Sequence, residues 1–151
     1  MLKKLVIIAD PDEVDENIVK NINATHKDYK IIISGIGKRC VDNIKKSEYF
    51  PLIDENTKII NIGVVGCNGV KNYKIGDIVK PKDLCKIKTV MKFESDKNKI
   101  PKDCFIDMEK SHLDKLFKNI KYIKIVSDFI DYNEYKNNLN NLKRIILQKI
   151  L

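Results

Sequence analysis

The chain has few of the residues that bind metals or form disulfides. Among its 151 residues there are only two histidines, His26 and His112, and four widely spaced cysteines that form no C-x-x-C pair. Metal sites need clustered ligands of these types, and disulfide frameworks belong to short chains rich in cysteine. We therefore expect a reduced, cytoplasmic protein with no metal and no cofactor, in which the cysteines are small core residues.

Arginine is also scarce, although the formal net charge is +8. The basic residues are nearly all lysines spread along the chain, and the only arginines are Arg39 and Arg144. Base reading and phosphate binding favour the planar arginine fork, and no strongly basic stretch is interleaved with aromatic residues. This pattern favours a solvated basic surface and indicates no nucleic-acid partner.

No apolar run is long enough to cross a bilayer. The run at residues 5–9 is short and is followed at once by Asp10, which predicts a buried strand and not a signal peptide. We therefore expect no membrane partner. The length predicts one domain, residues 1–151, with a core that needs neither disulfide nor metal.

Apolar runs and helical spacings alternate along the chain. Runs typical of strands lie at residues 5–9, 29–34, 58–62, 87–93, 105–106 and 123–126. Between and after them, apolar residues recur at helical spacing at 14–22, 41–44, 109–117 and 135–150, and residues 94–102 read as a surface loop. This alternation favours a three-layer α/β domain.

Five polar or glycine-containing segments each follow one of these apolar runs. They are residues 9–13, 35–38, 63–66, 107–109 and 127–128. In an open α/β sheet, ligands lie outside the carboxyl ends of the strands, so these segments should converge in space. Gly63 and Gly66 would let the backbone bend sharply or approach a ligand closely. The sequence thus predicts one ligand site that contains Glu13, Glu109 and Asp128.

Each of these carboxylates also has a structural interpretation. Glu13 would lie in the first turn of a helix, where an acid interacts favourably with the helix dipole. Asp128 could cap the turn into the last helix, although Asp131 is better placed for that. Glu109 is harder to explain in this way, because it shares a predicted helical face with apolar residues and an unpaired buried carboxylate is costly.

Taken in order, several segments resemble motifs of the nucleoside phosphorylase superfamily, and most of all its 5′-methylthioadenosine/S-adenosylhomocysteine nucleosidases. The matching segments are residues 34–38, 60–66, 75–79, 107–109 and 127–131. Any one of them is a weak signal, but the ordered set is specific. The resemblance implies a three-layer α/β/α domain with a mixed central sheet, and it implies a homodimer.

The resemblance also implies that water cleaves the N-ribosidic bond of a purine nucleoside. Glu13 would activate the water, Asp128 would protonate the purine, Glu109 would bind the ribose hydroxyls and Met108 would pack against the sugar. The remaining substrate-binding positions are Gly63, Val64 and Ser127. An acid on the base and a base on the water would each lower the barrier.

The chain departs from the family pattern in the segment 80–104, which is shortened. In the family the corresponding segment supplies an aromatic that stacks on the base. The base pocket would then be open, be built from residues such as Phe105 or Phe129, or be completed by a partner subunit. Two alternatives to hydrolysis remain: a non-catalytic nucleoside-binding or regulatory module, and a phosphate-dependent phosphorylase, for which Arg39 is the only nearby arginine.

Overall fold

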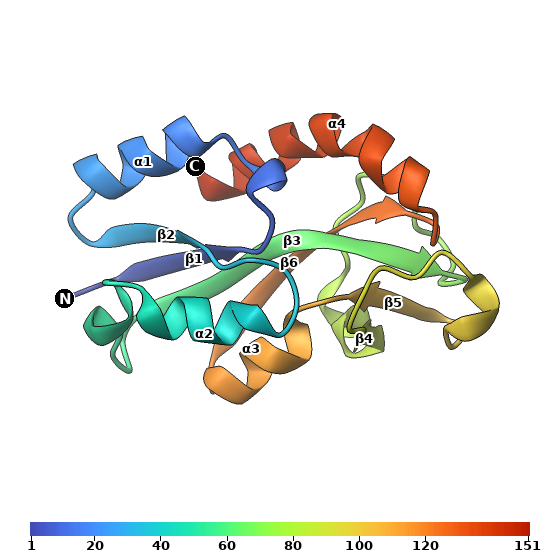
Figure 1. Ribbon diagram of the computed structural model, residues 1–151, viewed down its shortest axis with the longest axis horizontal. Helices are drawn as coiled ribbons and strands as arrows, with labels where there is room; N and C mark the ends of the chain where they lie inside the picture. Colours follow the sequence, from blue (N-terminus) through green and yellow to red (C-terminus); the bar gives the residue numbers. More distant parts are fainter.

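The computed structural model describes residues 1–151 as a six-stranded sheet between two layers of helices (Figure 1). On one face lie α1 (Glu16–Thr25) and α4 (Tyr132–Ile150), and on the other lie α2 (Arg39–Lys46) and α3 (Lys110–Leu116). The predicted three-layer α/β/α fold is confirmed. None of the helices is both long enough and apolar enough to span a membrane.

The sheet is mixed, as predicted. Its strands are β1 (Lys4–Ile8), β2 (Tyr29–Ile33), β3 (Lys58–Asn68), β4 (Ile87–Thr89), β5 (Cys104–Asp107) and β6 (Ile120–Asp128). β1 lies between β2 and β3, β6 pairs with β3, and all four of these strands are parallel. β5 runs antiparallel to β3, and β4 pairs with β5 in parallel.

β3 changes its partner along one edge. Up to Asn61 it pairs with β1, and from Gly66 onward it pairs with β5, while β6 occupies the opposite edge. Residues 62–65 therefore have no strand partner on the first edge. Because β5 is antiparallel to β3, its carboxyl end at Asp107 points toward the carboxyl end of β1 at Ile8. The candidate site lies in the opening between these two strand ends.

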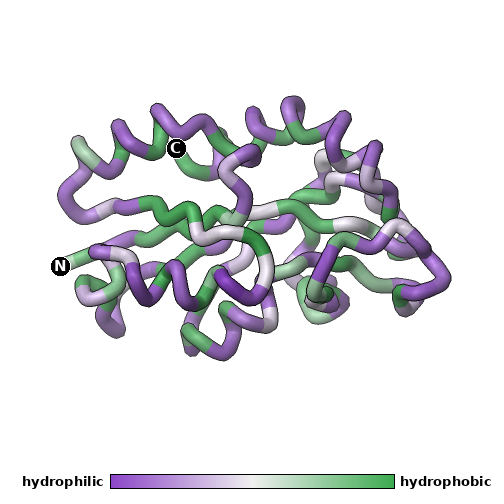
Figure 2. Tube along the Cα trace, viewed as in Figure 1, coloured by the Kyte–Doolittle hydropathy of each residue, from purple (hydrophilic) through white to green (hydrophobic).

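The core has one main apolar cluster on each face of the sheet. The first includes Val19 and Ile22 of α1 and Leu142 of α4, and the second includes Cys40 of α2 and Leu113 of α3. Figure 2 shows the apolar residues concentrated on the strands and on the helix sides that face them, with polar residues outside. The prediction that the cysteines lie in the core is wrong for Cys85, which is exposed, whereas the other three are buried.

The predicted first helix is interrupted. Pro11–Glu13 forms a separate 3-10 turn, η1, whose first N–H groups are capped by Asp10. Val14 is extended, and α1 begins only after its own N-cap, Asp15. The prediction that Glu13 lies in the first turn of this helix is therefore wrong. Two aspartates five positions apart each cap a turn, and this divides the segment.

A sharp bend at Gly63 and Gly66 was one of the two alternatives that the sequence left open, and it is wrong, because β3 continues through both glycines to Asn68. Its pairing with β6 along residues 59–66 keeps the backbone extended. The register of this pairing shifts between Val65 and Gly66, which leaves Ser127 as a bulged residue without a partner. Bulges of this kind redirect side chains at the ends of strands.

The segment 80–104 contains a 3-10 turn, η3 (Pro81–Lys86), the strand β4 and another short turn, η4 (Lys97–Lys99). The strand predicted at 87–93 is shorter than expected, because the chain leaves the sheet after Thr89. The predicted surface loop is mostly exposed, although Ile100 is buried.

Candidate functional site

A cavity of about 340 Å³ opens where β3 changes its partner, at the carboxyl ends of β1, β5 and β6. Its walls include every site residue predicted from the sequence except Gly63, namely Glu13, Val64, Met108, Glu109, Ser127 and Asp128. The convergence expected from the positions of these residues after the strands is therefore observed.

Gly63 does not line the cavity, and its lack of a side chain allows Lys124 and Glu13 to approach the backbone of β3 closely. A Cβ atom on Gly63 would lie 3.3 Å from Nζ of Lys124 and 3.8 Å from Oε2 of Glu13. The first distance is tighter than ordinary van der Waals contact, so a larger residue would displace the lysine. Of the two interpretations of this glycine, a sharp bend is wrong, because β3 continues through it, and close approach to a ligand stays a prediction.

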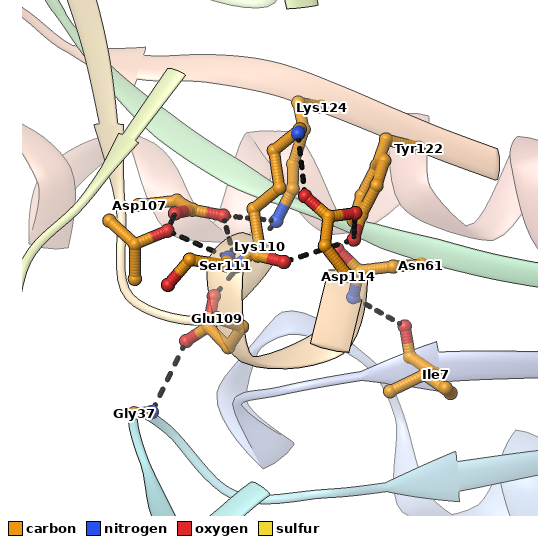
Figure 3. A network of polar contacts seen from close by, with 11 residues as sticks. Ile7, Gly37, Asn61, Asp107, Glu109, Lys110, Ser111, Asp114, Tyr122 and Lys124 are labelled. Atoms are coloured by element: carbon orange, nitrogen blue, oxygen red, sulfur yellow. Dashed lines mark hydrogen bonds and ion pairs between the residues drawn. The ribbon is translucent and has the colours of Figure 1, made fainter. Parts of the chain in front are cut away.

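Lys124 is a buried cation beside the carboxylates of the site, and it was not among the residues predicted from the sequence (Figure 3). It is fully buried on β6 opposite Gly63 in the ladder, and its Nζ lies 3.0 Å from Asp107 Oδ2 and 3.9 Å from Glu109 Oε2. The contact with Asp107 is an ion pair, and Nζ has no hydrogen-bond partner. The signal in the sequence is a lysine between Ile123 and Ile125 in an apolar strand, because a buried charge needs a partner.

Asp107 has three partners within the protein. It caps the start of α3, as predicted, by accepting the Lys110 N–H at 3.0 Å, and it accepts the Thr89 hydroxyl at 2.8 Å (Figure 3). Thr89 in turn accepts the Ser111 N–H at 2.9 Å. With Lys124 beside it, Asp107 is occupied by the protein itself and serves to hold the lysine in place.

Glu109 has far fewer contacts than Asp107. The prediction that Glu109 lies within the helix is wrong, because α3 begins at Lys110 and Glu109 is its N-cap residue. It is 7% exposed, and its Oε1 accepts only a long hydrogen bond of 3.5 Å from the Gly37 N–H. Burial raises the pKa of Glu109, and Lys124 opposes this rise. Its carboxylate therefore has free capacity for hydroxyl groups of a ligand.

Glu13 is the least satisfied acid. It is 4% exposed, and its Oε2 has no hydrogen-bond partner. Burial raises the pKa of Glu13 well above its ordinary value, the charge of Glu109 raises it further, and Lys124 opposes both effects. An unpaired carboxylate of this kind is expected where a ligand or water completes the hydrogen bonding.

Asp128 both faces the cavity and caps the turn toward α4, so its two interpretations are combined. Its Oδ2 accepts the N–H groups of Ile130 at 3.0 Å and Asp131 at 3.2 Å. Its Oδ1 lies 2.6 Å from the Ser127 hydroxyl. Burial raises the pKa of Asp128, while these hydrogen bonds oppose the rise. Asp131 caps α4, as predicted, by accepting the Glu134 N–H at 3.0 Å.

Three aromatic side chains line the cavity: Phe93, Tyr132 and Tyr135. The rings of Phe93 and Tyr132 meet edge to face at 5.1 Å, and Tyr132 is 45% exposed. Neither Phe105 nor Phe129 lines the cavity. Phe105 is completely buried in the core, so these two alternatives for the base pocket are wrong. The segment 80–104 does supply an aromatic, since Phe93 lies four residues beyond β4.

No group of three or more histidine, cysteine, aspartate or glutamate side chains in the structure is placed to hold a metal ion. No arginine lines the cavity either, and Lys136 is the only cation among its lining residues, whereas Lys124 lies deeper, beside Asp107 and Glu109.

This chain is similar to known proteins in its structure, whereas comparisons of its sequence find no match. No protein-family model matches the sequence, and no curated protein matches it. The MTA/SAH nucleosidase of Streptococcus pneumoniae, solved with 8-aminoadenine, aligns over 97% of this chain and 96% of its own with a TM-score of 0.68 and 14% identity.

A protein of Borrelia burgdorferi B31, solved with adenine and described as a 5′-methylthioadenosine/S-adenosylhomocysteine nucleosidase, is also similar. It aligns over 97% of this chain and 98% of its own, with a TM-score of 0.63 and 18% identity. The chain therefore has a nucleoside phosphorylase-like fold of the type found in MTA/SAH nucleosidases.

Proposed function

We propose that this protein is a nucleosidase that uses water to cleave the N-ribosidic bond of a purine nucleoside. One observation carries the proposal. Glu13 Oε2 and Lys124 Nζ are both buried without a hydrogen-bond partner, and both lie within 4 Å of the position that a Cβ atom on Gly63 would take. A water molecule bound between this acceptor and this donor would satisfy both, and it would be the nucleophile.

In the proposed reaction the bond between C1′ and the purine nitrogen breaks, and both electrons leave with the base. The sugar gains oxocarbenium character, and the water adds to C1′ as Glu13 takes its proton. Lys124 would hold the water by donating a hydrogen bond to its oxygen. Inverting glycosidases use the same division between a base on the water and an acid on the leaving group.

Asp128 would donate the proton to the leaving purine. Burial raises the pKa of Asp128 and so favours the protonated form that this role requires, although the hydrogen bonds that its carboxylate accepts from Ser127, Ile130 and Asp131 oppose the rise.

The sugar would lie between Glu109 and Met108. Glu109 has a nearly unused carboxylate for the ribose hydroxyls, whereas Asp107 is occupied by Thr89, Lys110 and Lys124. Gly63 and Val64 would form the wall beside the nucleophile. The adenine and 8-aminoadenine in the two structural neighbours support a purine as the base.

Two other functions remain as alternatives to hydrolysis at this cavity: phosphorolysis, and nucleoside binding without turnover. A phosphorylase would place phosphate where the water is proposed, but the buried carboxylate of Glu13 would repel that anion. A non-catalytic module would bind the nucleoside without turnover. The shortened segment 80–104 and the exposed Tyr132 favour this second candidate, because the base would be only partly enclosed.

The test is the release of free base from methylthioadenosine, S-adenosylhomocysteine, adenosine and inosine, with and without phosphate. The proposal expects release without phosphate, and Asp128→Asn should abolish it while leaving nucleoside affinity nearly unchanged. Dependence on phosphate would identify a phosphorylase. Nucleoside binding in calorimetry without release would identify a binding module.

We also infer a cytoplasmic homodimer. Met91, which is 87% exposed, lies between two cavity-lining residues, Val90 and Phe93, and gives the cavity an apolar rim. Sedimentation equilibrium should find a dimer, and a monomer at high concentration would count against a site shared between subunits.

A further inference from the structure

One side-chain hydrogen bond joins α4 to the turn that carries Glu13. Tyr135, in the first turns of α4, donates its hydroxyl to Asp10 Oδ2 at 3.0 Å. Asp10 Oδ1 accepts the Asp12 N–H at 2.9 Å, and the Asp10 carbonyl accepts the Glu13 N–H at 3.0 Å. Asp10 therefore closes the η1 turn with one carboxylate oxygen and is anchored to α4 with the other.

This anchor is the only side-chain hydrogen bond between residues 10–13 and another element of the fold. The other hydrogen bonds of η1 lie within the turn itself, and the Glu13 carboxylate is not held by any donor. A single turn of 3-10 helix has little stability of its own. The orientation of Glu13 therefore depends on what fixes Asp10.

Tyr135 is suited to this task. It is half-buried against the cavity, and burial together with the charges of Glu13 and Asp10 raises its pKa. Its hydroxyl thus remains protonated and acts as a donor to the Asp10 carboxylate. Hydrogen bonds to an ionised acceptor are stronger than those between neutral groups.

We propose that Tyr135 is a positioning residue for Glu13, which it holds through Asp10 in the buried, water-facing orientation that the proposed hydrolysis requires. The inference rests on the proposed function for its effect on turnover, but not for its effect on Glu13 itself. Loss of the hydroxyl would free Asp10 and loosen η1. Bulk solvent would then reach Glu13, and its carboxylate would move away from the proposed nucleophilic water.

The titratable groups around Glu13 come from four elements. Three of them are charged, Glu109 at the start of α3, Lys124 of β6 and Asp10 before its own turn, and the fourth is the neutral hydroxyl of Tyr135 of α4. Removing the Tyr135 hydroxyl leaves the three charges unchanged. The remaining effect is greater exposure of Glu13, which lowers its pKa toward the ordinary value. As a base, Glu13 must be ionised, so the acid limb of kcat/KM would move to lower pH.

The experiment compares Tyr135→Phe with Tyr132→Phe. Tyr132 also lines the cavity, so its variant is a control for the titration of Glu13 and not for turnover: it lies in the same turn and aromatic group, but its hydroxyl makes no hydrogen bond to Asp10. For Tyr135→Phe we expect kcat to fall about five- to tenfold, the loss of one hydrogen bond, with KM within about twofold and the acid limb shifted down. A raised KM with unchanged kcat would instead show direct ligand contact and would overturn the proposal.

A second readout is independent of turnover. The Glu13 carboxyl can be titrated by carbon-13 NMR in the ligand-free protein, with the signal assigned through Glu13→Gln. Tyr135→Phe should lower this pKa and Tyr132→Phe should not. A shift in a protein without turnover would retain the positioning role and reject the proposed function. An unshifted titration would overturn the positioning role whatever the activity.

Discussion

The two ends of the parallel strands contain lysine in opposite environments. At the amino ends, Lys58 and Lys121 are exposed, and toward the carboxyl ends Lys124 is completely buried beside carboxylates. Lys121 and Lys124 are three residues apart on the same strand. The net positive charge of the chain is therefore mostly solvated lysine, and its one buried lysine belongs to an acidic cavity. The composition is enough to predict the exposed lysines, whereas the burial of Lys124 follows only from the packing around it.

The largest expected effect is a difference in the free energy of unfolding between variants of Lys124 and Lys121. Lys124→Met removes the partner of Asp107 and leaves a buried carboxylate without its cation, which should lower the free energy of unfolding by about 3–5 kcal/mol. Lys121→Met should change it by less than about 0.5 kcal/mol, because exposed lysines on a strand are already solvated. Urea unfolding of both variants measures the difference. Equal losses would mean that the buried ion pair does not stabilise the site.

A smaller effect compares two threonine hydroxyls, one at each end of the sheet. Thr89 donates to the Asp107 carboxylate at 2.8 Å, and Thr57, beside the amino end of β3, donates to the Leu2 carbonyl at 2.6 Å. Thr89→Val should cost about 1.5–3 kcal/mol because the acceptor is charged, and Thr57→Val should cost about 0.5–1.5 kcal/mol. Thermal and urea unfolding give both values, and the reverse order would contradict the central place of Asp107.

The smallest expected effect has the opposite sign and depends on pH. The pKa of Glu13 is raised in the folded protein above the ordinary value of 4.5, chiefly by burial. Protonated Glu13 is thus favoured by folding, and this contribution is full below pH 4.5 and is lost as pH rises through the folded pKa. Glu13→Gln should match the parent protein near pH 4 and become the more stable of the two toward neutral pH.

The control for this change is Asp12→Asn in the same turn, where the side chain is exposed. Its stability relative to the parent protein should show no such rise with pH. If Glu13→Gln gained no stability relative to the parent protein between pH 4 and pH 7, Lys124 would already offset the burial of the carboxylate.

The elements of the fold could be predicted where the apolar pattern is local. The alternation of runs and helical spacings located all four helices and all six strands, and the polar segments after the strands located the cavity. The boundaries near the site could not be predicted so well. Whether β3 bends at Gly63 depends on its pairing with β6, which is remote in sequence, and the division of the first helix depends on competition between Asp10 and Asp15 as caps.

The sequence predicted the acidic residues of the candidate site but not the lysine and the phenylalanine beside them. Glu13, Glu109 and Asp128 follow strands, and this placement is visible in the sequence. Lys124 lies within a strand, and its burial follows from the packing of β6 beside β3 under α3. Phe93 lies in a loop, and nothing local assigns it to the cavity.

By itself, the sequence determined the alternating elements and the presence of carboxylates at one edge of a sheet, because burial periodicity and strand ends are properties of neighbouring residues. The tertiary structure decided which of those carboxylates is satisfied and which is left free. Asp107 receives its lysine and its threonine from β6 and β4, whereas Glu13 receives no donor. Hydrogen bonding and desolvation depend on atoms brought together from distant parts of the chain, and they are fixed only when the chain has folded.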